Sequence, residues 1–345
     1  MNIKEAIGEI VEGRDLSCRQ AQEVMNVIMT GGATDAQVAA LLIGLRTKGE
    51  TVDEITGFAA VMREHAADVR PREAFVIDTC GTGGDNRGTF NISTTTAFAA
   101  AGAGARVAKH GNRSVSSRCG SADVLEALGV NLNIEPAAVA ACVDEVGIGF
   151  LFAPALHAAM RYVMPARKET GVRTVFNILG PLTNPARAAA QVVGVYSPDL
   201  TETLARVLDK LGTRHALVVH GADDLDEMST TGATKVCELK SGKIESYEVS
   251  PEDVGLPRTT LADISGGSPD ANALILKSIL AGETGPKRDI VLLNTAAALV
   301  AADLAPNLTE GIDLAAESID SGRAEAKLTD LIRFTTTRRG SLRAG

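Results

Sequence analysis

Apolar residues recur at helical spacing across residues 1–70, for example at Val24 and Ile28. Capping boxes, in which a Ser or Thr is followed three residues later by Gln or Glu, stand in front of these runs. They are Ser17 with Gln20, Thr34 with Gln37, and Thr51 with Glu54. The pattern predicts a small all-helical N-terminal domain. Because its helices are short, they must pack on one another or on a second subunit.

After Pro71 the pattern changes, and short apolar runs alternate with helical stretches. Strands are expected at residues 75–77, 106–108, 148–152, 192–196 and 216–219, and helices near residues 94–103, 124–128, 137–146 and 201–211. This alternation predicts a larger α/β domain over residues 71–345, with a central, largely parallel sheet flanked by helices. Residues 235–249 are predicted to form a polar hairpin that turns at Ser241-Gly242.

One segment interrupts this alternation. Residues 164–185 are rich in Pro and Gly, and we expect about 165–186 to cross back and join the helical domain. From Asn272 onward the chain is expected to be mostly helical, and the sequence indicates no chemistry there.

Composition narrows the classes of function. The 345 residues are 45% hydrophobic and 22% charged, which is typical of a globular protein large enough for two domains. A net charge of −9, 3% aromatic residues and no Trp argue against a nucleic-acid partner. The five cysteines are scattered outside any CxxC pair, which argues against structural zinc. The sequence lacks an apolar signal segment and a membrane-length apolar run, so we expect a cytoplasmic location and no membrane partner.

Candidate chemistry begins directly after the first expected strand. In Asp78-Thr-Cys-Gly-Thr-Gly-Gly-Asp85, three glycines in four residues let the backbone approach a ligand and aim N–H groups at a phosphate. A tight strand-to-helix turn is the alternative. Phe90-Asn-Ile-Ser-Thr-Thr-Thr96 then opens a helix, where hydroxyls and free N–H groups favour an anion. Taken alone, Ser93 is equally explained as a simple N-cap.

Two further loops follow expected strands. Lys109 to Arg118 gathers cations, an amide and hydroxyls around one glycine, a set of donors that suits a polyphosphate. Asp223-Asp-Leu-Asp-Glu227 supplies carboxylates, and beside a phosphate site these favour Mg²⁺. Both loops also fit a solvated charged turn.

Together these motifs resemble the anthranilate phosphoribosyltransferase family, within the phosphoribosyltransferases and nucleoside phosphorylases that carry a helical N-terminal domain. The resemblance covers nearly the whole chain. The matching motifs are Gly81-Thr-Gly-Gly-Asp85, Asn91-Ile-Ser-Thr94, Lys109-His-Gly-Asn-Arg113 with Ser116-Ser117, Phe152-Ala-Pro154 with His157, Pro165-Ala-Arg167, Arg173 to Asn184, and Asp226-Glu227.

The resemblance implies transfer of a phosphoribosyl group from 5-phosphoribosyl 1-pyrophosphate (PRPP) to the amine of anthranilate, in tryptophan biosynthesis. It also implies a homodimer formed through the helical domain, and two Mg²⁺ ions per subunit. The residues that it implies for PRPP are Gly81, Gly84, Asp85, Thr89, Asn91, Ser93, Thr94, Lys109, Asn112, Arg113, Ser114, Ser116, Ser117 and Ser121. Those for anthranilate are Gly81, His110, Asn112, His157 and Arg167, and those for the metal are Ser93, Asp226 and Glu227. No general base is expected, because the anthranilate amine is neutral at pH 7.

Three positions depart from the family pattern. Asn86 and Asp224 stand where glycine is common, and Cys119 stands where serine is common.

Two other functions are compatible with parts of this sequence. A pyrimidine nucleoside phosphorylase shares the architecture and the basic loop, although those chains are typically longer and use phosphate as the nucleophile. A non-catalytic relative that binds nucleic acid in the same cleft would leave Asp226 and Glu227 unexplained.

Overall fold

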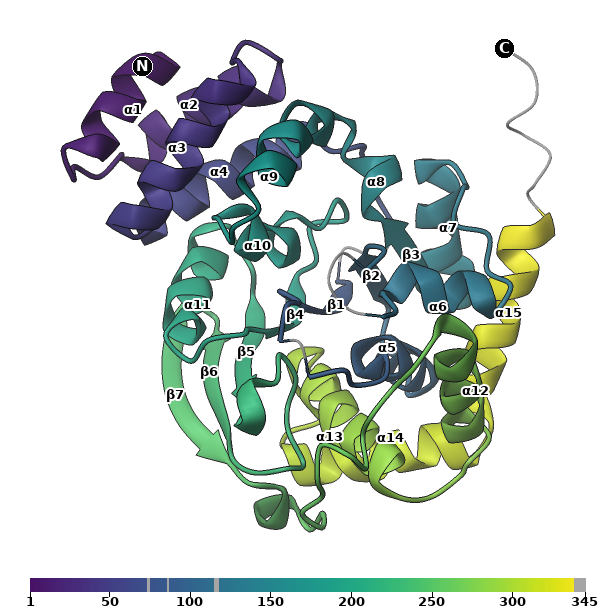
Figure 1. The fold of residues 1–345 in the computed structure, drawn as a ribbon. Helices are drawn as coiled ribbons and strands as arrows, with labels where there is room; N and C mark the ends of the chain where they lie inside the picture. The colour runs from purple at the N-terminus through teal and green to yellow at the C-terminus, as the bar shows by residue number, and fades with distance from the viewer. Residues whose placement is uncertain (73–74, 86, 115–117, 338–345) are drawn as a thin grey trace.

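The computed structural model describes residues 1–72, 75–85, 87–114 and 118–337. Its N-terminal part is a bundle of α1 (Ile3–Val11), α2 (Cys18–Met29), α3 (Asp35–Lys48) and α4 (Val52–Glu64), which lies at one end of the molecule (Figure 1). The three expected capping boxes are confirmed. A fourth, at Asn2 and Glu5, starts α1, and a search for Ser or Thr caps misses it.

The rest of the chain is built on one seven-stranded sheet with the order β3-β2-β1-β4-β5-β6-β7. Its strands are β1 (Ile77–Gly81), β2 (Val107–Gly111), β3 (Ile148–Phe152), β4 (Ala190–Gly194), β5 (His215–Gly221), β6 (Thr234–Lys240) and β7 (Lys243–Val249). The strands β1 to β5 are parallel, whereas β6 and β7 run antiparallel to their neighbours. The expected turn at Ser241-Gly242 joins β6 to β7, with positive φ at both residues, as hairpin turns favour.

Helices cover both faces of the sheet. The helices in this part of the chain are α5 (Ile92–Gly102), α6 (Ser121–Ala127), α7 (Pro136–Val146), α8 (Ala153–Leu156), α9 (Met164–Thr170), α10 (Phe176–Leu179), α11 (Leu200–Lys210), α12 (Pro269–Leu280), α13 (Pro286–Ala301), α14 (Leu308–Asp320) and α15 (Arg323–Thr337). Successive strand residues point to opposite faces. Val192 and Leu217 therefore enter one core with α5 and α13, while Val193 and Val218 enter another with α11 and the helical bundle.

The segment around α9 and α10 packs against the bundle. Its apolar side chains lie in the same core as those of α1 to α4, and α9 contacts α3. These side chains are Val163, Ala166, Val175, Phe176, Ile178, Leu179 and Leu182. The chain thus returns to the helical bundle between β3 and β4.

The first strand lies later in the chain than expected, because it begins at Ile77 rather than at residue 75. Asp78 is fully buried within it, and its carboxylate accepts from the His110 N–H (3.1 Å) and from Asn184 Nδ2 (2.7 Å). Desolvation raises the pKa of Asp78, and these donors make the buried carboxyl group tolerable. The other expected strands and helices are present, with ends shifted by a few residues.

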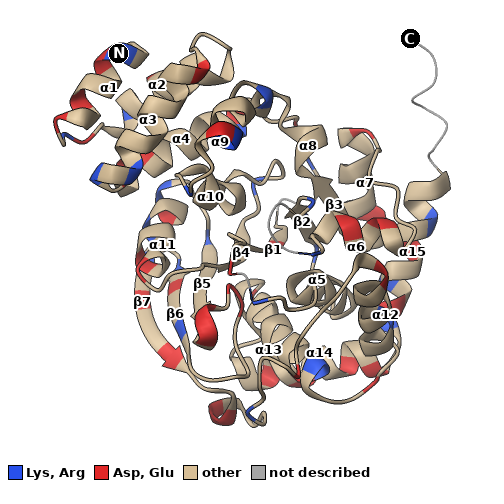
Figure 2. Ribbon diagram, in the orientation of Figure 1, with Lys and Arg blue, Asp and Glu red and all other residues tan. Residues whose placement is uncertain are grey.

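Acidic and basic residues occur side by side along the elements of the fold. Figure 2 shows acidic and basic residues interspersed along the outer helices around the sheet. Among the helices of the described ranges, none is both long enough and apolar enough to cross a membrane.

Candidate active site

The candidate residues gather at the carboxyl edge of the sheet, near the neighbouring strands β1 and β4. Along the chain β1 leads to β2 on one side, whereas β4 leads to β5 on the other. Open α/β sheets bind ligands in the crevice where the strand order reverses in this way. Residues 82–90, which follow β1, are called here the phosphate loop, and residues 222–227, which follow β5, the acidic loop.

Two hydrogen bonds join the acidic loop to the elements expected to bind phosphate. The Gly83 N–H donates to the Asp226 carboxylate (2.7 Å), and the Ser93 N–H donates to the Glu227 carboxylate (3.1 Å). A Cβ at Gly81 would collide with Asp226 Oδ2, so the close approach requires glycine there. The structure therefore brings Gly81, Ser93, Asp226 and Glu227 together from distant parts of the chain.

The two carboxylates fit a divalent cation. Desolvation raises the pKa of both Asp226 and Glu227, and the neighbouring Asp85 raises that of Asp226 further. A cation would relieve this cost by favouring the charged forms. No three His, Cys, Asp or Glu side chains of the described ranges form a metal-ligand cluster. Two carboxylates suit Mg²⁺, which commonly completes its shell with water and substrate phosphates.

Helix α5 begins directly after the phosphate loop, with Asn91 at its N-cap. The alternative that Ser93 is a simple N-cap is therefore wrong, since Ser93 lies inside the first turn. The Asn91 side chain makes no capping bond. Instead its Nδ2 donates to the Cys119 carbonyl (3.2 Å), and its Oδ1 accepts from Asn272 Nδ2 (2.9 Å). Thr94 Oγ1 is buried without a partner among the described residues. The Ile92 N–H donates to the Phe90 carbonyl (2.8 Å) and the Ser93 N–H to Glu227, so it is the positive end of the helix dipole that favours an anion here.

Strand β2 contributes a buried cation. Lys109 is only 3% exposed, and its ammonium donates to the Thr79 carbonyl and to Ser93 Oγ (3.3 Å), between β1 and α5. Farther along, the Ser121 hydroxyl donates to the Asn112 carbonyl (3.2 Å). Ser121 is the first residue of α6, and Gly120 is its N-cap.

Arg113 lies in the connection between β2 and α6. Its guanidinium pairs with Glu126 (2.7 Å) and Asp123 (3.2 Å) of α6, and it lies over the Phe152 ring. The Ser114 N–H also donates to Asp123 (3.0 Å). In this arrangement Arg113 and Ser114 organise the loop through α6. The expected residues Ser116 and Ser117 lie outside the described residues.

The residues expected to bind anthranilate include two histidines and one arginine. His110 Nε2 and His157 Nε2 lie 3.2 Å apart, and burial lowers the pKa of His110 to about 3 and that of His157 to about 4. Arg167 is half-buried over the Phe176 ring, and burial lowers its pKa. Asn112 Oδ1 accepts from the next residue's N–H (2.7 Å). The two rings are thus neutral at pH 7, and Arg167 is the cation among the residues expected to bind anthranilate.

Two departures from the family pattern have visible contacts. Asp224 forms an ion pair with Arg87 of the phosphate loop, and both Asp223 and Asp224 have positive φ, which glycine adopts more readily. The Cys119 thiol donates to Asn91 Oδ1 (3.3 Å), as a serine hydroxyl would. The third departure, Asn86, lies outside the described residues.

Sequence reasoning gave no role to several polar residues that hold the site in place. Asn184 binds Asp78, and Asn272 orients the Asn91 amide. The Arg173 guanidinium donates to the Gly84 carbonyl and lies over the Tyr196 ring. Arg173 and Asn184 are the first and last residues of the family motif 173–184, so the sequence does point to both of them. Asn272 carries no motif, because only its long-range partner reveals it.

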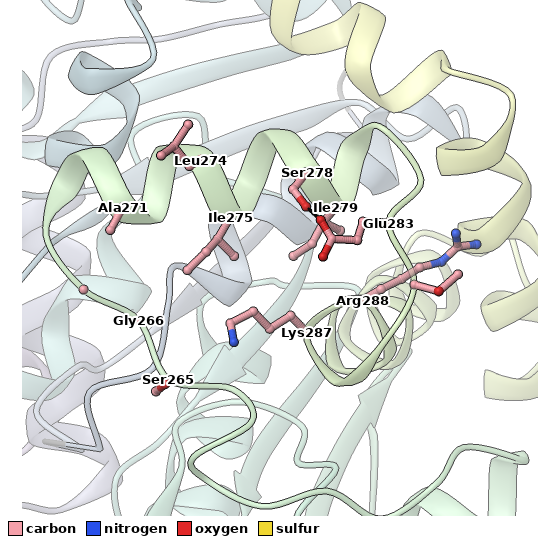
Figure 3. Close-up of a pocket in the computed structure, with 12 residues that line it drawn as sticks. Ser265, Gly266, Ala271, Leu274, Ile275, Ser278, Ile279, Glu283, Lys287 and Arg288 are labelled. Carbon is pink, nitrogen blue, oxygen red and sulfur yellow. Dashed lines mark hydrogen bonds between the residues drawn. The ribbon is translucent and has the colours of Figure 1, made fainter.

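A cavity of about 440 Å³ lies elsewhere, between α12 and α13 (Figure 3). Its wall combines apolar side chains such as Leu274 with Lys287 and Glu283, and no residue expected to bind substrate lines it. The Gly266 N–H at its edge donates to the Gly88 carbonyl (2.9 Å), so the cavity lies behind the phosphate loop. It is therefore not the crevice described above.

Comparison with known proteins agrees with this geometry. Residues 73–325 match the family described as "Glycosyl transferase family, a/b domain", and residues 4–66 match "Glycosyl transferase family, helical bundle domain". The chain is 57% identical to the anthranilate phosphoribosyltransferase of Symbiobacterium thermophilum, over 96% of this chain and 98% of that protein. The same enzyme of Moorella thermoacetica is also 57% identical, with the same coverage.

The chain belongs to the anthranilate phosphoribosyltransferase family. It therefore transfers the phosphoribosyl group of PRPP to the amine of anthranilate, giving N-(5-phosphoribosyl)anthranilate and pyrophosphate in tryptophan biosynthesis. This assignment favours the transferase over the nucleoside phosphorylase and the nucleic-acid binder.

Solved anthranilate phosphoribosyltransferases share the fold. The crystal structure of the Thermus thermophilus enzyme has a TM-score of 0.92 at 45% identity, covering 96% of this chain and 99% of that chain. The Saccharomyces cerevisiae enzyme in complex with PRPP and Mg has a TM-score of 0.89 at 28% identity, covering 97% and 98%.

Proposed function

We propose that PRPP binds between the phosphate loop, the start of α5 and the acidic loop, and that anthranilate binds beside Arg167 and the histidine pair. The observation that carries this proposal is the pair of contacts from Asp226 to Gly83 and from Glu227 to Ser93. They hold both carboxylates beside the phosphate loop and the start of α5, the elements proposed to bind the phosphates. Relatives in the family have been solved with PRPP and Mg and with 4-fluoroanthranilate, which supports both halves of the proposal.

Asp226, Glu227 and the Ser93 hydroxyl would hold Mg²⁺, and we propose two ions per subunit. When bound, the metal neutralises charge on the pyrophosphate as it leaves. The buried Lys109 ammonium and the N–H groups at the start of α5 add fixed positive charge on the same side of the substrate. Because these donors are already in place, they need no rearrangement as the charge develops.

The chain's own groups supply binding and orientation rather than a base. Cleavage of the bond from ribose C1 to pyrophosphate leaves positive character on the sugar, and the neutral amine of anthranilate attacks it. The surplus proton passes to the carboxylate of anthranilate or to water. His110 and His157 suit this scheme poorly as bases, because pKa values of about 3 and about 4 leave them little affinity for a proton at pH 7.

The decisive assay follows the loss of anthranilate fluorescence after the purified protein is mixed with PRPP, with and without magnesium. Loss that requires both PRPP and magnesium is the expected result. Absence of loss under every condition would contradict the proposed chemistry. Thymidine with phosphate is the matched control, since it is the substrate pair of the phosphorylase alternative and should not react.

We also propose a homodimer formed through the helical bundle, and a cytoplasmic location. Exposed apolar side chains support the first proposal, since Val11, Ile43 and Met164 lie on α1, α3 and α9, and both α1 and α9 pack against α3. A second subunit would cover these residues. The proposed cytoplasmic location rests on the substrates, which are anions used in biosynthesis.

A further inference from the structure

Helix α13 contains a buried asparagine that its surroundings do not favour. Asn294 is 1% exposed, and the helix around it is apolar and almost entirely buried. Asparagine is a poor residue for a helix interior, and burying its amide is costly unless the amide is hydrogen-bonded. The side chain must therefore have partners that offset this cost.

The carboxamide of Asn294 is fully hydrogen-bonded. Its Oδ1 accepts from the Met228 N–H (2.9 Å), while its Nδ2 donates to the Met228 carbonyl (2.8 Å) and to the Ile290 carbonyl (2.8 Å). The first two bonds pair with both the backbone N–H and the backbone carbonyl of Met228, as a neighbouring β-strand would. Rotating the amide by half a turn would place donor against donor, so only one orientation fits.

Met228 directly follows the two carboxylates of the acidic loop. It is completely buried, and after it the Ser229 N–H donates to Thr234 Oγ1 (2.9 Å). Before the carboxylates, the Gly221 N–H donates to the Leu225 carbonyl (2.9 Å). Hydrogen bonds therefore fix the backbone on both sides of Asp226 and Glu227. Those from Asn294 to Met228 are the nearest to Glu227 along the chain.

We propose that Asn294 is a positioning residue, which fixes the backbone at Met228 so that Asp226 and Glu227 face Gly83 and Ser93. The inference rests on the proposed role of these carboxylates in binding magnesium. A purely structural role would predict loss of stability alone. A positioning role predicts in addition that magnesium binds more weakly, because the residues that orient metal ligands typically contribute about 10–100-fold in affinity or activity.

The test uses the full-length protein and the variant Asn294→Ser, whose side chain is too short to reach Met228. The melting temperature is measured at saturating PRPP while magnesium chloride is titrated, and each variant is referred to its own value without magnesium. We expect the concentration that gives half of the rise to increase about tenfold or more. We also expect faster amide hydrogen exchange at Met228 and an anthranilate KM within about twofold of the original.

Leu293→Ala is the matched control, because Leu293 is equally buried on the same helix but lies outside the site. It should lower the melting temperature and leave the magnesium titration unchanged. If Asn294→Ser does not fold, Asn294→Gln replaces it, since glutamine keeps the donors and the acceptor but places them one carbon farther along the side chain.

The outcomes separate the two claims. Asp226→Ala is titrated in parallel, and an unchanged magnesium response there would overturn the proposed metal site, and the role of Asn294 with it. A weakened response in Asp226→Ala, beside a titration for the Asn294 variant that matches Leu293→Ala, would overturn the positioning role alone.

Discussion

At the scale of single residues, Arg167 is a half-buried cation that forms no ion pair with the described residues. Its guanidinium has no hydrogen bond or ion pair with the described residues, and it lies over the Phe176 ring at 5.5 Å. A guanidinium matches the geometry of a carboxylate. A carboxylate ligand would thus find a donor that has nothing else to bind.

Replacing this donor should therefore affect one substrate. We expect Arg167→Ala to raise the KM for anthranilate by about tenfold or more, the usual worth of a charge-assisted hydrogen bond. The KM for PRPP should change little. Initial rates over a range of each substrate measure both values. Lys168→Ala, an exposed neighbour on α9, is the control, and an unchanged anthranilate KM in Arg167→Ala would rule out this role.

The histidine pair should make stability depend on acid. The folded pKa values of about 3 for His110 and about 4 for His157 lie below the ordinary 6.5. As the pH falls below about 6.5 the unfolded chain takes up protons that the folded chain does not, so stability is lost toward pH 4. In His157→Gln, melting temperatures between about pH 7 and pH 4.5 should fall less steeply than in the original protein. Equal slopes would contradict the burial argument.

At the scale of elements, the acidic loop places two carboxyl groups where ionisation is unfavourable. Because the folded pKa of Asp226 is raised above its ordinary 3.8, the folded state loses stability as the pH rises above that value. Asp226→Asn removes this loss. Without magnesium, the variant should therefore melt higher than the original by about 2 °C or more at pH 8, and should show no such gain near pH 4.

The same variant should lose function while it gains stability. With PRPP present, magnesium should no longer raise its melting temperature, and turnover should fall. Such opposition between stability and activity is common at functional sites. A variant that is less stable than the original at pH 8 would show that the carboxylate is not strained in the metal-free protein.

Elements with local signals could be predicted from the sequence, and those that depend on distant partners could not. Ser17 and Gln20 lie within one turn, so their capping box is visible in the sequence. Asp78 looks too polar for a buried strand, because its partner Asn184 is 106 positions away. Asn272 and Asn294 had no predicted role for the same reason, since each acts through a residue far along the chain.

At the scale of the whole molecule, the exposed apolar residues of the helical bundle bear on assembly. Ile43 is 39% exposed near the centre of α3. If two subunits meet there, Ile43→Asp would bury an unpaired charge at the interface, and we expect it to give monomers. Light scattering coupled to size-exclusion chromatography measures the mass. Leu274→Asp, on α12 and 70% exposed, should remain dimeric, and a dimeric Ile43→Asp would exclude this face.

The hydrogen bonds between Asn294 and Met228 also have a consequence for folding during translation. The helical bundle and β1 to β5 are made first, and domains tend to fold as they emerge. The backbone that carries Asp226 and Glu227 acquires its anchor only after α13, 66 positions later, has left the exit tunnel. If Asn294 has the proposed positioning role, a nascent chain that stops before α13 would contain every residue expected to bind the substrates and would still lack the ordered pair of carboxylates, so that catalytic competence would arrive late in translation.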